Sequence, residues 1–554
     1  MKVYFEGTKY KYSLIDERLK LYFDEINDKD ESITEYVGYY AHIDKVPVVI
    51  LPKIFTKLVK DNKDIIEELS LDGFKSNKTS YEGIPASFVS KIVYLFYLSL
   101  IKFLKRNPKS ELSKKGCIHD VKLNKSSMDT TELETVIALE EFYIQHKDLL
   151  SFKHNESNSK NFANVDWRKT IRSTAPINIG RSLLYPSPIT SEEDADFSDE
   201  LLTVYFSLLN YLSKTYGQKL SIDSRYTLIP HRNFSSFVKK SRKILRRING
   251  QHFDDRFIRL SKLLKAYFEI QPLKKKSSFK EDKLLIKGYN IVFEDMIDLL
   301  LSDKKVLNEL KNQRDGKVVD HIYQYNSLFD GDDVYYIGDS KYYKDTTTFS
   351  NNSKYKQFTY AKNVIQFNVD PFGEHEKLTY RDEFTEGYNL SPSFFINGFL
   401  FDTNLSTTAH GFKVDESTKT MFLCQFENRA FDRDSLYLCY FKLNFLFILQ
   451  SYIIENKTLI SRFRNLSYEL IRNHYLKLYN ENYQFYKLTP NISLEKFINK
   501  FFKIFHGKIY RGNSDIKDNT LTLALSRSKN HEKSNNELLQ KLAYFSNCKE
   551  FNLY

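Results

Sequence analysis

The stretch from Gly316 to Tyr360 constrains the fold of this chain more than any other part of the sequence. Two of its segments, 318–325 and 334–343, are rich in Val, Ile and Tyr, as β-strands are. The sequence Asp-Gly-Asp-Asp at 330–333 lies between them and is typical of a tight turn. We therefore predict an antiparallel hairpin folded about that turn.

Charged side chains occupy one end of the predicted hairpin. Folding about the turn brings Asp320 opposite residues 340–342. Because side chains alternate along a strand, Asp339 and Lys341 share one face and Ser340 points away. Two carboxylates and one ammonium group converge if Asp320 faces the same side.

Such a group of charges suits a hard divalent cation. Two carboxylates a few ångströms apart repel each other unless a cation lies between them. Mg²⁺ prefers carboxylate and carbonyl oxygens, so we predict Asp320, Asp339 and the Ser340 carbonyl as its ligands. A lysine beside the cation orients or helps to deprotonate an attacking water, which is the role expected of Lys341. The alternative is an ordinary solvated ion pair between Asp339 and Lys341.

The segments around the hairpin extend this pattern. Residues 289–310 are predicted to form an amphipathic helix that carries Glu294, either as a direct or second-sphere metal group or as an exposed helical Glu. A further helix carries Gln357 and Tyr360, and residues 392–401 are predicted to add a strand. The resulting order is helix, strand, strand, helix, strand.

This succession resembles the PD-(D/E)xK nuclease superfamily, with Val319 in place of the usual Pro before the first Asp. Gln357-x-x-Tyr360 is similar to the Gln-x-x-x-Tyr helix of RecB-like members, one residue shorter. The resemblance implies an α/β core, with a mixed sheet flanked by helices, that hydrolyses phosphodiester bonds with Mg²⁺. It also implies that Glu294 supports the metal and that Gln357 and Tyr360 steady Lys341 or a phosphate.

A wider set of segments resembles the LlaJI-type restriction endonucleases, which are similar to the nuclease subunit of McrBC systems. The resemblance implies a restriction subunit for phage defence that cuts double-stranded DNA together with a separate AAA+ GTPase. The chain has no G-x-x-x-x-G-K-[ST] phosphate loop of its own. The segments are 165–171, 292–297, 319–323, 338–343 and 426–436, with a looser match at 51–55.

The net charge of +12 favours an anionic partner, with nucleic acid first among the candidates. A compositional bias of the source genome is the alternative, and 39 Tyr and 44 Phe beside one Trp fit it equally well. The basic helix predicted over 237–248 either contacts phosphates or is a solvated face. Trp167 is expected to be a buried anchor at a domain junction, and contact with DNA or a partner is its alternative role.

A length of 554 residues suggests about three or four domains. We predict a β-rich N-terminal region with helices over 1–160, a candidate for docking the partner, and a helical, basic middle region over 161–275. The nuclease domain is predicted over 280–454 and a mostly helical region over 455–554. The fold class expected for the whole chain is α/β, as a multidomain α+β protein.

The cysteines and the hydropathy of the sequence indicate the cellular compartment of the protein. The four cysteines are scattered and form no C-x-x-C pair, which predicts a reducing, cytoplasmic setting without a structural zinc. The first residues lack the apolar core of a secretory signal. The apolar run over 437–454 is predicted to begin a series of helices, and it is too short to span a bilayer.

Two other functions stay open at this point. The chain is alternatively a non-catalytic subunit with a decayed nuclease core that binds DNA or stimulates a partner's GTPase. The intact Asp/Asp/Lys set argues against that alternative, because nothing structural requires three charges on one strand pair. A stand-alone nuclease acting on RNA or branched DNA is also compatible with the composition.

Overall fold

The computed structural model describes thirteen ranges of the chain, apart from single positions and short gaps within them, together with isolated positions between 118 and 157. The ranges are 2–56, 80–112, 165–194, 200–216, 226–230, 234–248, 254–273, 282–302, 308–328, 332–344, 349–369, 378–400 and 410–553. From the sequence we also predict a helix over 131–150 and a linker over 271–283, and both lie mostly outside these residues.

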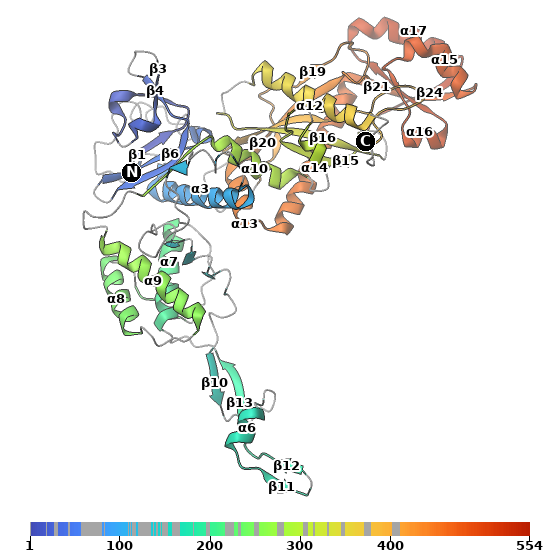
Figure 1. Ribbon diagram of the computed structural model, residues 1–554. Coiled ribbons are helices and arrows are strands. Elements are labelled where there is room, and N and C mark those ends of the chain that lie inside the picture. The colour runs from blue at the N-terminus through green and yellow to red at the C-terminus, as the bar shows by residue number, and fades with distance from the viewer. Residues whose placement is uncertain are drawn as a thin grey trace.

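The N-terminal region is built on a five-stranded sheet of order β1-β6-β5-β14-β9 (Figure 1). Its strands are buried on both faces, because alternate side chains enter two different hydrophobic clusters: Val3 and Phe5 lie in one and Tyr4 in the other. Its strands are β1 (Lys2–Phe5), β6 (Lys45–Leu51), β5 (Tyr36–His42), β14 (Asp282–Lys287) and β9 (Ile118–His119). Short elements beside it are β2 (Lys9–Lys11), β3 (Asp24–Ile26), β4 (Glu31–Ile33), β7 (Ser80–Tyr81) and β8 (Ile84–Pro85).

The boundary between this region and the next domain differs from the predicted one. Strand β14 pairs with β5 and β9, so residues 282–287 complete the N-terminal sheet instead of opening the nuclease domain. The sheet thus joins segments from both sides of the helical middle region. Hydrophobic periodicity indicates that a segment is a strand, but it does not indicate which strands it pairs with. For this reason the sequence placed the start of the nuclease domain too early.

Helices and a narrow arm make up the middle of the chain (Figure 1). Helix α3 (Ala86–Arg106) contacts α7, and α8 packs on both α7 and α9. The helices of this region are α7 (Glu200–Tyr216), α8 (Phe234–Arg247) and α9 (Asp255–Leu273). The arm projects away from them and consists of β10 (Lys153–Ser157), α6 (Trp167–Ser173), β11 (Ile177–Ile179), β12 (Ser182–Leu184) and β13 (Thr190–Asp194).

A six-stranded mixed sheet lies at the centre of the molecule. Strands β15 and β16 pair antiparallel, whereas β16, β17 and β20 pair parallel. The parallel strands are buried along almost their whole length, as strands covered on both faces are. The strands are β15 (His321–Asn326), β16 (Asp333–Lys341), β17 (Ser393–Phe399), β20 (Leu436–Asn444), β18 (Lys413–Val414) and β19 (Met421–Leu423).

Helices pack against this sheet in the predicted order of helix, strand, strand, helix, strand. Helix α10 (Tyr289–Leu301) contacts β15 and β16, and α12 (Asn351–Val369) contacts β16 and β17. At Gly398 an added Cβ would lie 2.9 Å from Ile54 and Phe293, so only glycine lets β17 approach these side chains. The remaining helices here are α11 (Asn308–Lys311), α13 (Phe445–Ile454) and α14 (Lys457–Asn482).

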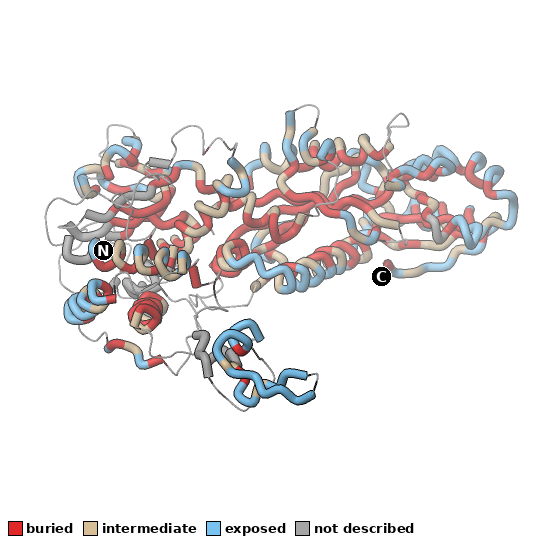
Figure 2. The backbone as a smooth tube through the Cα atoms, turned by 60° about the horizontal axis from the view of Figure 1, so that its bottom comes forward, coloured by how far each residue is buried: buried red, intermediate tan, exposed pale blue. Residues whose placement is uncertain are grey.

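The apolar run over 437–454 is only half helical. Its first part is the central strand β20, which the sequence did not predict, and its second part is α13, which leads into further helix as predicted. A continuous apolar run suits both a strand buried on two faces and a buried helix. Most residues of this run belong to a hydrophobic core that includes residues of the N-terminal and central sheets, and Figure 2 shows buried backbone running through the interior.

The last seventy residues form a small α+β unit with its own core. A four-stranded sheet of order β22-β23-β21-β24 accompanies the predicted helices. Its strands are β21 (Tyr483–Pro490), β22 (Ile509–Tyr510), β23 (Leu521–Ser526) and β24 (Ser546–Phe551). Its helices are α15 (Leu494–Phe505), α16 (Asn513–Asp518) and α17 (Glu532–Ala543).

The architecture is therefore a multidomain mixture of helices and mixed sheets, in agreement with the predicted class. No helix among the described residues combines the length and the apolar character that crossing a bilayer requires.

Asp298 joins α10 to its neighbours and makes the fold sensitive to acid. Its Oδ1 lies 2.6 Å from Lys311 Nζ and 3.6 Å from Nδ1 of the buried His321. Although burial opposes ionisation, the contacts with His321 and Lys311 hold the pKa of the Asp298 carboxyl well below its usual range. A depressed pKa gives stability that is present above the unfolded value, about 3.9, and lost as pH falls.

We expect Asp298→Asn to lower the free energy of unfolding at pH 7 by about 1–3 kcal/mol, because it removes a charged hydrogen-bond partner. The difference from the unaltered protein should shrink below about pH 4, where the unfolded chain takes up the proton. Thermal melting between about pH 2 and 7 measures both effects. The exposed Glu309→Gln, on the neighbouring helix, is the control, and an equal loss there would assign the effect to net charge.

Candidate metal and phosphodiester site

The register of the β15–β16 hairpin brings the two aspartates together. His321 pairs with Gly338, so Asp320, just before β15, stands next to Asp339 on β16. The sequence placed Asp320 inside the strand and opposite residues 340–342, one position further along. The amide of Ser340 donates a hydrogen bond of 3.3 Å to Asp320 Oδ2, which fixes the carboxyl group against the hairpin.

Asp339 and Lys341 are in direct contact, as their shared face predicts. Lys341 Nζ lies 2.5 Å from Asp339 Oδ2, and 5.2 Å above the ring of Phe395 on the neighbouring strand. Asp339 is only 3% exposed, so this ion pair is no solvated surface pair. The Ser340 hydroxyl is buried away from any partner among the described residues, in agreement with its pointing to the other side.

Asp320 and Glu294 are carboxyl groups of the site whose pKa is raised. Burial raises the pKa of the Asp320 carboxyl well above its ordinary value, and the neighbouring Asp339 and Glu294 carboxyls raise it further. Burial also raises the pKa of Glu294, against a hydrogen bond from Asn290. Lys341 opposes both shifts. Like charges crowded into a partly dry site are what a bound cation would relieve.

The residues present fit a hard cation through two side chains, with Glu294 outside that pair. Asp320 and Asp339 offer adjacent carboxylates, which is the donor chemistry that Mg²⁺ takes together with waters and carbonyl oxygens. Within the described part of the chain no three His, Cys, Asp or Glu side chains form a ready-made metal cluster. Glu294 interacts electrostatically with Asp339, which helps to raise the pKa of the Glu294 carboxyl group.

Gln357 and Tyr360 are buried on α12, and among the contacts of the described residues neither forms a hydrogen bond with Lys341. The Gln357 amide is fully buried and donates to the carbonyl of Ile337 at 2.9 Å and to the Ser393 hydroxyl at 3.2 Å. It thereby joins α12 to β16 and to the start of β17. Tyr360 is also buried, with Lys356 Nζ 5.4 Å above its ring.

Lys356 is a cation of this site that the sequence analysis missed. A hydrogen bond with Tyr360 raises its pKa, against desolvation, and the carboxylates of Asp339 and Asp320 add to the rise. It also interacts with Glu294. Its position one residue before Gln357 was the available signal, because that turn of the helix faces the hairpin. Lys356 and Lys341 thus bring two ammonium groups to three carboxyl groups.

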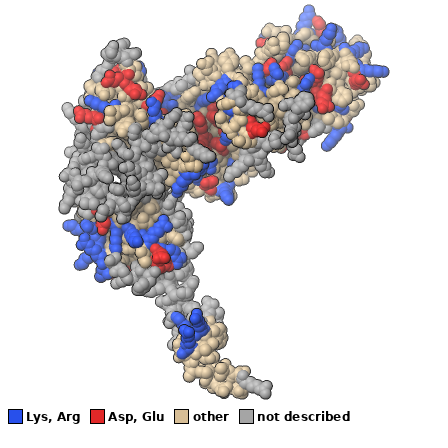
Figure 3. Space-filling view, viewed as in Figure 1, with Lys and Arg blue, Asp and Glu red and all other residues tan. Residues whose placement is uncertain are grey.

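Surface features named from the sequence lie elsewhere. Trp167 is 58% exposed on the arm, so the expectation of a buried anchor was wrong. The predicted basic helix is α8, and most of its Lys and Arg side chains are exposed. Figure 3 shows these cations gathered over that face of the middle region. One of them, Arg247, is paired with Glu200.

Comparisons with known proteins give little beyond this geometry. No protein-family model matches the chain, and no curated protein matches it. One solved structure is similar, a refined half-complex from a tetradecameric assembly of Thermococcus gammatolerans McrB AAA+ hexamers with bound McrC. The match has 10% sequence identity and a TM-score of 0.25, and covers 82% of this chain and 99% of that chain. At that TM-score the likeness carries no argument, so the site rests on its own residues.

Gln357→Leu separates support of the fold from a role in ligand binding. We expect it to lower the free energy of unfolding by about 1–3 kcal/mol, because the Ile337 carbonyl stays buried without its donor. Mg²⁺ affinity of the folded variant, measured by calorimetry, should stay within about twofold. Gln366→Leu changes an exposed glutamine of the same helix and is the control. A tenfold loss of Mg²⁺ affinity in Gln357→Leu would instead make Gln357 part of the site.

Proposed function

We propose that this protein is a Mg²⁺-dependent endodeoxyribonuclease subunit of a restriction system that acts with a separate AAA+ GTPase. The observation that carries the proposal is that Asp320 and Asp339 are adjacent at the end of one hairpin, with Lys341 paired to Asp339. The resemblance of this hairpin and its helices to the PD-(D/E)xK nucleases supports the same reaction class.

Each group has a distinct task in such a reaction. Asp320 and Asp339 hold the Mg²⁺, which when bound supplies Lewis-acid stabilisation of charge on the phosphate. Lys341, whose ammonium group is paired with Asp339, would orient the attacking water by donating a hydrogen bond to it. Glu294 keeps the local potential negative, which favours cation binding. Lys356 would supply a second positive charge near the two aspartates to stabilise negative charge on a phosphate.

Double-stranded DNA is the substrate that the charge distribution favours. The net charge is +12, and the exposed cations of α8 offer a surface for backbone phosphates. Contacts of this kind position a duplex without reading its sequence. The target sequence is therefore set by other residues or by the partner.

The arm supplies a surface for the protein partner. Six large apolar side chains on it are each about half exposed (Figure 2). A group of exposed apolar side chains of this kind is typical of a protein interaction surface. An apolar surface of this kind suits a protein and not the polar backbone of DNA. The six are Trp167, Ile171, Ile177, Ile179, Leu183 and Leu184.

Asp339→Asn and Lys341→Met test the catalytic assignment. We expect each to lower cleavage of plasmid DNA by about 10²–10⁴-fold, because each removes a group that acts on the water or the cation. The assay uses the complex purified from the native host, with Mg²⁺ and GTP. Asp339→Asn should also abolish Mg²⁺ binding in calorimetry, whereas Lys341→Met should retain it.

Asp333→Asn, at the opposite end of the same strand, is the matched control and should cleave normally. Unchanged cleavage in Asp339→Asn would refute the site. Mg²⁺ binding that does not depend on Asp320 or Asp339, together with no cleavage by the unaltered complex, would favour the non-catalytic subunit with a decayed core.

The partner surface is tested by the double change Ile171→Glu and Leu183→Glu on the arm. We expect the AAA+ GTPase to be lost from the complex purified from the native host, since two buried charges oppose an apolar interface. Mass spectrometry of the purified complex measures this loss, and unchanged Mg²⁺ affinity shows that the variant is folded. Leu21→Glu alters a side chain that is 91% exposed on the N-terminal region. Loss of the partner there alone would place docking on that region.

A further inference from the structure

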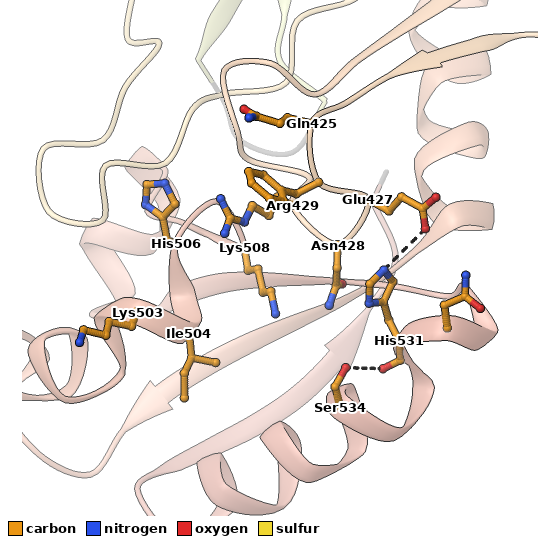
Figure 4. A pocket seen from close by; sticks show the side chains of 12 residues that line it. Gln425, Glu427, Asn428, Arg429, Lys503, Ile504, His506, Lys508, His531 and Ser534 are labelled. Atoms are coloured by element: carbon orange, nitrogen blue, oxygen red, sulfur yellow. Dashed lines mark hydrogen bonds and ion pairs between the residues drawn. The ribbon is translucent and has the colours of Figure 1, made fainter.

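A second candidate site lies in the C-terminal part of the protein, away from the aspartate pair. A pocket of about 500 Å³ opens between the loop at 425–429 and the C-terminal α+β unit. The end of α15, the turn that follows it and the start of α17 form its other walls (Figure 4). None of the residues assigned above to metal or water lines it.

The walls of this pocket are strongly cationic. Arg429, Lys503 and Lys508 line it together with two histidines, and Glu427 is its one carboxylate among the described residues. Glu427 is turned to the rim, where its carboxylate lies 3.6 Å from Nε2 of His531. Figure 4 shows Lys508 pointing into the space between Lys503 and Asn428. The pocket therefore has a positive interior and only one acid to balance it.

Lys508 is held in this pocket at an electrostatic cost. Burial lowers the pKa of its ammonium group, and the nearby Arg429 guanidinium lowers it further. No carboxylate among the described residues contributes to its environment. A half-buried cation next to another cation is a destabilising arrangement unless an anion joins them. Arg429 has one acidic partner among the described residues, Asp432, with Nη1 and Oδ2 3.8 Å apart, whereas Lys508 is affected only by burial and by Arg429. A negative ligand between Lys508 and Arg429 would relieve their repulsion.

The backbone is shaped to bring these two cations together. Gly507 has a φ of +70°, and an added Cβ would lie 3.0 Å from the Arg429 side chain. Only glycine combines that backbone angle with so close an approach. The amide of Phe431 also donates to the Gly507 carbonyl at 2.9 Å, which fastens the two segments to each other. The backbone conformation at Gly507 therefore keeps Arg429 and Lys508 close to each other.

An aromatic side chain stands at the mouth of the same pocket. The Phe426 ring is 46% exposed, and the Arg429 guanidinium lies 3.9 Å from its centroid. An exposed ring beside a guanidinium is a platform on which a nucleobase stacks. Cations inside and a ring at the mouth match the two halves of a nucleotide, its phosphate and its base.

We propose that this pocket binds the phosphate group of a nucleotide unit, with Arg429 and Lys508 on the phosphate and Phe426 against the base. The ligand is either a nucleotide within a DNA strand or a free nucleotide, since both carry this chemistry. The site goes beyond the proposed nuclease function and does not rest on it, because no residue is shared.

The test is fluorescence anisotropy with a labelled ten-nucleotide single strand and the full-length protein. EDTA is present, so cleavage does not interfere. We expect Lys508→Gln to weaken binding by about tenfold and to lower the salt dependence by about one phosphate contact. Its melting temperature should stay equal or rise, because repulsion with Arg429 disappears. A purely structural lysine would give the opposite, a lower melting temperature with unchanged affinity.

Lys496→Gln is the matched control, since it removes an exposed lysine of α15 that does not line the pocket. It should change affinity by less than about twofold. Competition by deoxyguanosine monophosphate separates the two sources of phosphate. Lys508-dependent binding of the monophosphate without binding of the strand identifies a free-nucleotide site, and binding of the strand identifies a DNA contact.

Equal affinities of the unaltered protein and Lys508→Gln for both the strand and the monophosphate would overturn the proposal. Because Asp339→Asn leaves this pocket intact, its strand affinity in EDTA should equal that of the unaltered protein. A failure of the nuclease assignment and a failure of this pocket are therefore distinguishable.

Discussion

The proximity of the Asp320 and Asp339 carboxyl groups is the constraint on which the rest of the site depends. Burial and mutual repulsion raise the pKa of Asp320, and the ion pair between Lys341 and Asp339 offsets part of that repulsion. The surrounding core is rigid enough to keep the groups together, since β16 is buried along nearly its whole length. A site that costs stability in this way is typical of functional positions rather than of structural ones.

Local patterns were sufficient for much of this arrangement. The strands of the hairpin follow from Val, Ile and Tyr on either side of an Asp-Gly turn, and the contact of Asp339 with Lys341 follows from alternation. The helices before and after the hairpin, and the strand over 393–399, were also predicted in the right order. These features depend on neighbours in sequence, which is why periodicity found them.

Long-range features were not accessible in the same way. Pairing of β14 with the N-terminal sheet depends on contacts across more than two hundred residues, and the strand character of β20 depends on burial from both sides. Trp167 was expected inside because large apolar side chains usually are, but the arm has nothing to cover it. Gln357 was assigned to the site, whereas its amide satisfies backbone and hydroxyl groups beneath it.

The junction of the N-terminal sheet with the central sheet has a mechanical consequence. Tyr342, the residue after Lys341, donates a hydrogen bond of 2.5 Å to the buried Glu6 carboxylate, and Lys53 Nζ lies 4.6 Å above its ring. Glu6 follows directly on the first strand of the chain. A tilt of the N-terminal sheet would therefore pull on the residue next to the ammonium group. Movement of the beginning of the chain would in this way be transmitted to the strand that carries Asp339 and Lys341.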